Sequence, residues 1–89
     1  MPANDPSADG AAAERAILDL VTERGAGRTV CPTEAARRLD AQNWRARLKD
    51  IRAAAARLAD RGLIRVTRKG KAVDIRTVKG VIRLGLPAQ

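Results

Sequence analysis

The segment from Gln42 to Gly62, QNWRARLKDIRAAAARLADRG, constrains the fold more than any other part of the chain. Its apolar side chains recur at helical spacing and predict one buried stripe, made by Trp44, Leu48, Ile51, Ala55 and Leu58. Four consecutive alanines favour a helix, and the closing glycine suits a left-handed C-terminal cap. Three cations, Arg45, Lys49 and Arg52, fall on a neighbouring stripe. We therefore expect a helix with one buried and one positively charged face, which is typical of a recognition helix.

The length and the residue types exclude several classes of protein. A chain of 89 residues forms one small domain, because it cannot divide its apolar side chains between two cores. One cysteine and no histidine exclude an internal disulfide and a Cys/His metal site, so no cofactor or metal is expected. No apolar run reaches the roughly 20 residues of a membrane span, and residues 1–10 lack a signal-peptide pattern. A cytoplasmic protein with no membrane role is the expectation.

The net charge of +8 is unevenly distributed along the chain. Acids outnumber bases in residues 1–40, whereas residues 41–89 contain three acids, Asp50, Asp60 and Asp74, among many lysines and arginines. Such asymmetry within one domain predicts a positive face and a polyanionic partner. The alternative is a charge excess that serves solubility without a target.

The N-terminal half predicts two helices joined by a short strand. Residues 1–9 are expected to be a disordered leader, because they contain two prolines and no sizeable apolar run. The first helix should begin near Asp9 or Gly10, with Asp9 as its N-cap, and end at about Arg24, burying Ala13, Ile17, Leu20 and Val21. Residues 28–31 are β-prone. A second helix should begin at Pro32, with Cys31 as N-cap and Glu34 completing a capping box.

The C-terminal part alternates with a period of two and predicts a hairpin. A two-residue turn at Lys69-Gly70 pairs Arg68 with Lys71, Val66 with Val73 and Ile64 with Ile75. A last apolar segment, 81–86, should add a third strand. In an alternative topology this segment pairs directly with 63–67, and residues 69–80 form one long arm. The sequence does not decide between the two.

The order of elements is helix, short strand, helix, long helix and hairpin, with Asp40-Ala41 as a tight connection before Gln42 or Asn43 caps the long helix. That order indicates an α+β winged helix-turn-helix domain over residues 10–86, with three helices and a small antiparallel sheet. The segments CPTEAAR, NWR, IRAAAARLADRGLI, VTRKGKAVD and KGVIRL also resemble a small bacterial family catalogued as a domain of unknown function, over about residues 12–86. The resemblance implies a compact winged-helix-like fold and no activity.

Catalysis is not indicated by the residue types. No histidine is present to act as a base, and Cys31, the one plausible nucleophile, is better explained as a helix cap than as a reactive thiol. Trp44 is expected to pack in the core, with a polar partner for its N–H, in preference to serving as a wedge or stacking platform. Ion pairs at helical spacing are expected between Arg15 and Asp19 and between Arg47 and Asp50. An enzyme is therefore not expected.

The basic side chains are the candidate functional residues. Arg45, Lys49 and Arg52 are expected in the major groove of double-stranded DNA, with Gln42 and Asn43 near base edges. The predicted phosphate or minor-groove contacts at the wing tip are Arg68, Lys69 and Lys71. Further cations crowd the hairpin and its return, namely Arg65, Arg76, Lys79 and Arg83. A single aromatic residue argues against single-stranded nucleic acid, whose binding depends on stacking.

A regulator of transcription is one role for such a protein. A protein–protein adaptor is the alternative function, because a winged helix does not fix function. The sequence specificity, the oligomeric state and the biological process are not visible in the sequence.

Overall fold

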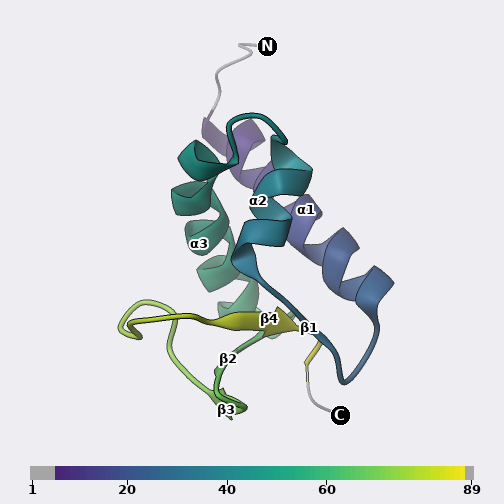
Figure 1. Ribbon diagram of the computed structural model, residues 1–89, viewed down its shortest axis with the longest axis vertical. Helices are drawn as coiled ribbons and strands as arrows, with labels where there is room; N and C mark the ends of the chain where they lie inside the picture. Colours follow the sequence, from purple (N-terminus) through teal and green to yellow (C-terminus); the bar gives the residue numbers. More distant parts are fainter. Residues whose placement is uncertain (1–5, 88–89) are drawn as a thin grey trace.

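The computed structural model describes residues 6–87, with side chains from Gly10 onward, as three helices packed above a small four-stranded sheet (Figure 1). The helices are α1 (Pro6–Arg24), α2 (Pro32–Leu39) and α3 (Trp44–Asp60). The strands are β1 (Thr29–Val30), β2 (Arg65–Arg68), β3 (Lys71–Ala72) and β4 (Arg83–Gly85). Among the described residues, no helix is long and apolar enough to cross a membrane.

The sheet joins β1, which precedes α2, to the strands that follow α3. Its strand order is β1-β4-β2-β3, and all neighbours are antiparallel. β4 is central, and its fully buried Leu84 lies opposite Val30 of β1 on one side and Val66 of β2 on the other. The last strand therefore pairs directly with the strand after α3, as the alternative topology predicted. Together with the α2–α3 helix-turn-helix, this arrangement is the α+β winged helix-turn-helix that the sequence indicated.

The predicted hairpin forms at its tip and ends sooner than expected. Arg68 lies opposite Lys71, and the Val73 N–H donates to the Val66 carbonyl at 3.0 Å. The predicted pairing of Ile64 with Ile75 is wrong, because the chain turns at Asp74, whose carbonyl accepts the N–H groups of Thr77 and Val78. Residues 73–82, which we call the arm, then loop out of the sheet before β4 (Figure 1).

The ends of the helices follow local capping chemistry. At the end of α3, Gly62 has φ 73°, the Leu63 N–H donates to the Leu58 carbonyl (2.9 Å), and the Gly62 N–H donates to the Ala59 carbonyl (3.0 Å). These two bonds form a Schellman motif. At the start of α2, the Cys31 N–H donates to Glu34 Oε2 at 2.9 Å, as the predicted capping box requires.

The start of the first helix differs from the prediction. α1 begins at Pro6, so Asp9 lies inside the helix and is not its N-cap. The helix therefore overlaps residues 6–9 of the expected leader, and residues 1–5 lie outside the described residues.

The core is aliphatic and lies between the helices and the sheet. The predicted stripe of α1 is buried, and so are Ile51 and Leu58 of α3. Leu48 and Trp44 were expected in the same stripe but are only half-buried. Leu48 lies at the edge of a hollow that the start of α2 and the arm do not close. The buried alanines of α3, Ala54, Ala55 and Ala56, allow neighbouring elements to pack closely around the helix.

Candidate nucleic-acid interface

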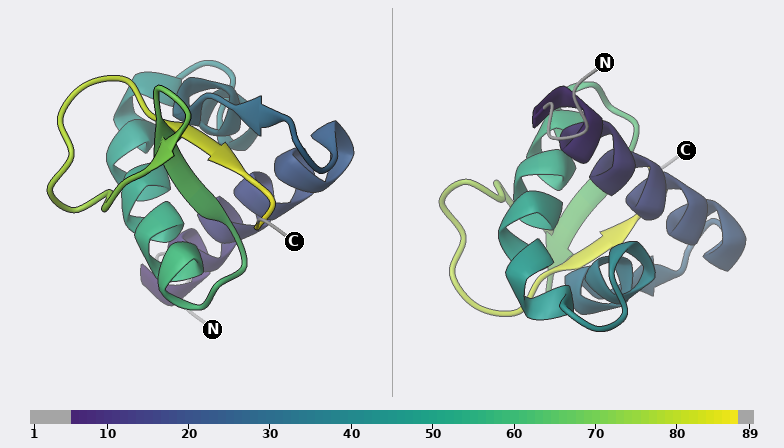
Figure 2. Two further views of the ribbon diagram at one scale, coloured as in Figure 1. Left: turned by 90° about the horizontal axis from the view of Figure 1, so that it is seen from below. Right: turned by 90° about the horizontal axis from the view of Figure 1, so that it is seen from above.

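The arm covers one end of the outward face of α3. Arg76 of the arm makes two bonds to Asp60 in the last turn of α3, from Nη2 to Oδ2 at 2.6 Å and from Nη1 to Oδ1 at 3.0 Å. This hydrogen-bonded pair lowers the pKa of the Asp60 carboxyl and raises that of Arg76. Ala56 lies one turn before Asp60 and is buried, and Figure 2 shows the arm running on alongside α3, where Gly80, Val81 and Ile82 line a hollow with Leu48 and Arg52. Arg45 and Lys49, in the N-terminal half of α3, are exposed.

The other end of the arm is held by Arg68. Its Nη1 donates to the Val81 carbonyl at 3.2 Å, and the neighbouring Gly80, at φ 99°, passes so close that a Cβ would collide with the guanidinium. Arg68 was predicted as a phosphate contact. In the structure Arg68, the last residue of β2, is half-buried, and one of its N–H groups already donates to the Val81 carbonyl.

The accessible half of α3 carries the cations that the sequence singled out. Arg45 and Lys49 are exposed, whereas Arg52 is half-buried at the rim of the hollow beside Leu48. The three side chains share one side of α3, and the end of the arm, from Gly80 to Ile82, lines the same hollow as Arg52. The charged stripe predicted from helical spacing is present on this half of the helix.

The turn before α3 exposes the two predicted base-reading residues. Gln42 and Asn43 are both exposed, and Asn43 is the N-cap of α3. The Asn43 N–H donates to Asp40 Oδ1 at 3.0 Å, which fixes the turn. The Asn43 side chain makes no cap hydrogen bond, so its amide is not committed to the helix end.

Trp44 combines packing against the core with a second role that the sequence did not predict. The guanidinium carbon of Arg37, in the last turn of α2, lies 4.8 Å from the centre of the indole ring, and that of Arg45 lies 4.4 Å from it. The expected partner for the indole N–H is not found among the described residues. The sequence signal for this cluster was an arginine at the end of one helix and a Trp-Arg pair at the start of the next.

The wing tip presents two lysines on a strained turn. Lys69 has φ 53° and Gly70 has φ 82°, as a two-residue turn of type I′ requires. Both Lys69 and Lys71 are exposed. A lysine in the left-handed region is costly for the backbone, so the tip retains a cation at a position where asparagine or glycine would fit more easily.

Carboxylates neutralise a different part of the surface. Glu14 of α1 accepts from Arg57 Nε at 2.7 Å and lies 3.4 Å from Arg61 Nη1, at the C-terminal end of α3. The predicted pair of Arg47 with Asp50 forms at 3.2 Å, whereas Arg15 and Asp19 do not pair. Two further pairs, Arg24 with Glu34 and Arg38 with Glu23, link α1 to α2.

The remaining cations differ in how they are engaged. Arg76, counted with the basic residues of the hairpin, is neutralised by Asp60 and does not contribute to the positive surface. Arg83 donates to the hydroxyl and carbonyl of Thr29 and stabilises the sheet. Ten cations of the α2–α3 junction, α3, the hairpin, the arm and β4 have no described carboxylate as partner. They are Arg37, Arg45, Lys49, Arg52, Arg65, Arg68, Lys69, Lys71, Lys79 and Arg83.

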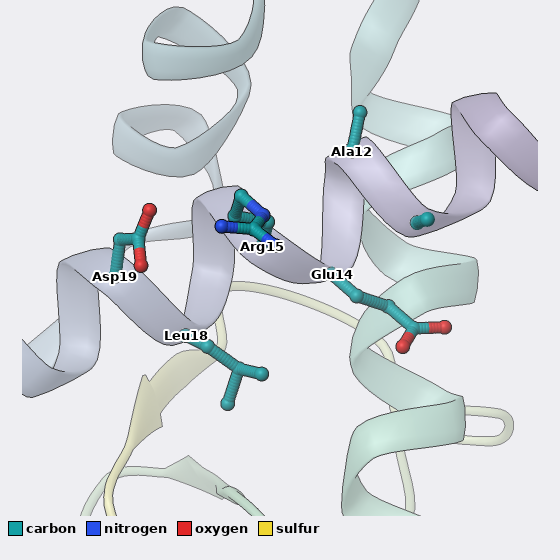
Figure 3. Close-up of a pocket in the computed structure, with 6 residues that line it drawn as sticks. Ala12, Glu14, Arg15, Leu18 and Asp19 are labelled. Atoms are coloured by element: carbon teal, nitrogen blue, oxygen red, sulfur yellow. The ribbon is translucent and has the colours of Figure 1, made fainter.

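Two hollows on the surface are weaker candidates. One lies on the outer side of α1 and is lined by Ala11, Ala12, Glu14, Arg15, Leu18 and Asp19 (Figure 3). It is formed by a single helix, and its Glu14 is already engaged by two arginines. The other lies between the start of α2, α3 and the arm, where Cys31 and the exposed Val81 line it. Among the side chains described, from Gly10 to Pro87, there is no cluster suited to a metal ion.

The strand order and the α2–α3 junction make this chain a winged helix-turn-helix protein of the α+β class. Residues 10–87 match the family described as "Protein of unknown function (DUF3253)", and the chain belongs to this family. The family resemblance seen in the sequence is thereby confirmed. A comparison with curated proteins found no match. The family carries no assigned activity, so a function must be argued from the residues themselves.

Proposed function

We propose that this protein binds double-stranded DNA through α3 and the wing, and that it acts as a binding protein, for example a transcriptional regulator, rather than as an enzyme. One observation carries the proposal: in the described part of the chain, the cations without a carboxylate partner belong to the α2–α3 junction, α3, the hairpin, the arm and β4, apart from Arg15 and Arg28. Glu14 engages arginines at the C-terminal end of α3, Glu23 engages Arg38 of α2, and Asp60 engages Arg76 of the arm. Asp50 pairs with Arg47 within α3. A surface of this kind attracts phosphates whatever the base sequence.

The dimensions of α3 suit the major groove. A groove about 12 Å wide admits one helix, and the residues at the N-terminal end of a recognition helix are those that approach base edges. Here the exposed Gln42, Asn43 and Arg45 occupy that end, and Lys49 and Arg52 follow along the same side. Lys69 and Lys71 at the wing tip would then contact phosphates or the minor groove beside the helix.

Duplex DNA suits the surface better than a single strand. Binding to single strands relies on aromatic side chains on which bases stack. The chain's one aromatic residue, Trp44, is half-buried and carries two arginines against its ring. The Trp44 ring is therefore not free to stack on a base.

The residue chemistry also favours binding over catalysis. The chain has no histidine, and Cys31 occupies the N-cap of α2, where its N–H is bonded to Glu34. The N-cap position explains the presence of Cys31 without a catalytic role. We assign the protein no substrate, cofactor or metal.

A protein–protein adaptor is the second candidate, and one feature favours it. The hollow between α2, α3 and the arm has an apolar lining of Pro32, Leu48, Val81 and Ile82. Val81 is 71% exposed, which is unusual for a large apolar side chain. A short apolar segment of a partner protein would fit such a surface, with Arg52 at its rim.

The deciding experiment is a titration of the protein with random-sequence duplex DNA over a range of salt concentrations. If about five cations contact phosphates, log K should fall with log salt at a slope of about −4 to −5. Replacing Arg45, Lys49 and Arg52 together by alanine should flatten the slope and weaken binding, with the fold retained.

The matched control removes the same charge elsewhere. Replacing Arg15, Arg28 and Arg38 by alanine also lowers the net charge by three, but these residues lie outside the proposed face. If the two triple variants lost the same affinity, binding would reflect net charge and not this surface. If the unaltered protein bound no duplex at low salt, the adaptor function would replace the proposal.

A further inference from the structure

We propose that Arg37 and Arg45, which stack on Trp44, form a binding site for one backbone phosphate of DNA at the helix-turn-helix junction. The inference rests on the function proposed above and adds Arg37, a residue of α2, to the contact surface. We call Arg37 and Arg45 the arginine pair.

The ring of Trp44 brings the two arginines together from different helices. Trp44 is the first residue of α3, and helical side chains lean back toward the N-terminus of their helix. Its ring consequently reaches the last turn of α2, where Arg37 lies 4.8 Å from the ring centre, while Arg45 lies 4.4 Å from it. The two guanidinium carbons are therefore no further apart than the sum of these two distances.

The arginine pair is held in position without using its hydrogen-bond donors. A cation–π contact holds a guanidinium over the ring without using its N–H groups as hydrogen-bond donors. The other arginines that are held by contacts spend donors on carboxylate, carbonyl or hydroxyl groups, namely Arg24, Arg38, Arg47, Arg57, Arg61, Arg68, Arg76 and Arg83. Arg37 and Arg45 donate no hydrogen bond to any described residue. They are therefore positioned, exposed and free to donate.

The charge of the arginine pair is not balanced within the described chain. Two cations beside one ring repel each other, and the attraction of an exposed cation to an aromatic face is weak. The acid nearest in sequence, Asp40, accepts the Asn43 N–H and forms no ion pair with either arginine. An anion with two or more accessible oxygens would relieve the repulsion and accept several of the free N–H donors. A phosphodiester has this chemistry, and the forked guanidinium matches it.

The location suits contact with one DNA strand. The arginine pair lies at the start of α3, whereas Arg76 of the arm bonds to Asp60 at the other end of the helix. The 17 residues of α3 extend over about 25 Å. A helix in the major groove has a phosphate backbone on each side, so the junction and the wing are placed to contact different parts of the duplex.

The test compares single variants in the duplex titration. Arg37→Ala should weaken binding roughly tenfold for any sequence and reduce the salt slope by about one. Arg15→Ala, which removes an exposed arginine on α1, should leave the affinity within about twofold. Trp44→Leu should weaken binding as much as Arg37→Ala although both arginines remain, whereas Trp44→Phe, which keeps a ring, should restore most of the affinity. A Trp44→Leu, Arg37→Ala double variant should lose little more than either single change, because the residues act as one unit.

Equal affinities for Arg37→Ala and Arg15→Ala would overturn the inference. Circular dichroism of each variant separates loss of the fold from loss of the site, and Trp44→Phe remains informative if Trp44→Leu does not fold.

A second readout does not depend on DNA binding. Trp44 is the only aromatic residue, so the intrinsic fluorescence reports on its ring alone. Inorganic pyrophosphate at millimolar concentration should change the emission of the unaltered protein, relative to sodium chloride at the same ionic strength, and should not change that of Arg37→Ala. If duplex binding failed but this response persisted, the anion site would stand and the proposed function would fall. No response to pyrophosphate, together with unchanged DNA binding by Arg37→Ala, would exclude the site.

Discussion

Replacing Lys69 at the wing tip by asparagine should make the protein more stable and a weaker binder of DNA. Lys69 has φ 53°, in the left-handed region that costs an ordinary L-residue about 1–2 kcal/mol. Asparagine tolerates this region and is favoured at the first position of a type I′ turn. We expect Lys69→Asn to raise the free energy of unfolding by about 0.5–1 kcal/mol, which is a rise in melting temperature of roughly 2–8 °C for a domain of this size. The same change removes a proposed phosphate contact.

The matched variant is Lys71→Asn, which removes the same charge two residues later. Lys71 lies in β3 opposite Arg68, in an extended conformation where asparagine has no advantage. Its loss relieves a similar repulsion at the tip, so the free energy of unfolding should stay within about 0.5 kcal/mol. Both variants should weaken duplex binding several-fold. Chemical denaturation and the salt titration measure the two effects. If Lys69→Asn were no more stable than Lys71→Asn, the argument from the left-handed lysine would be refuted.

Three further predictions concern the core, the arm and pH. Ile51→Ala should lower the free energy of unfolding by about 2–5 kcal/mol. Leu48→Ala should lower it clearly less, because Leu48 borders a hollow. Equal losses in urea denaturation would contradict the position of Leu48 at the edge of the core. Asp60→Asn should release Arg76 from its partner and strengthen binding to duplex DNA with little change in melting temperature, and unchanged affinity would show that Arg76 does not face the DNA. The Cys31 N–H, followed by Arg24, holds the pKa of the Glu34 carboxyl below its usual 4.5. The stabilisation that the ionised Glu34 provides is therefore complete above pH 4.5 and is lost as the pH falls through the depressed pKa. Glu34→Gln should flatten this part of a stability–pH profile.

Local patterns predicted the parts of the fold that depend on neighbouring residues. The capping box at Cys31 and Glu34, the glycine that ends α3 and the turn at Lys69-Gly70 all follow from chemistry within a few residues. The same holds for the buried stripe of α1. Helical spacing predicted the burial of α3 side chains less reliably. It identifies the apolar stripe, but it does not show how much of that stripe neighbouring elements cover. Leu48 has the right spacing and still faces a partly open hollow.

The position of the arm could not be obtained from such patterns. It depends on Arg76 reaching Asp60, sixteen residues earlier, and on Arg68 reaching the carbonyl of Val81. Glycine suits position 80 because its φ of 99° is strained for residues with a side chain, and a Cβ there would also displace the Arg68 guanidinium. The sequence showed a glycine and several cations in this region but not which of them would meet. The two topologies it left open each describe part of the result.

Charge along the sequence predicted a positive face, but it overestimated the extent of that face on α3. Counting charge by halves treats α3 as wholly basic, yet Glu14 of α1 reaches across to Arg57 and Arg61, more than forty residues later. Packing of α1 against the C-terminal part of α3 makes these contacts possible, and the arm adds the pair between Arg76 and Asp60. Both effects act on the same end of the helix. The unpaired charge is consequently concentrated on the first half of α3 and its junction with α2, where Arg37 becomes part of the surface through Trp44. If the proposed binding face is limited to this region and the wing, the measured salt slope should correspond to fewer phosphate contacts than there are cations in the C-terminal half.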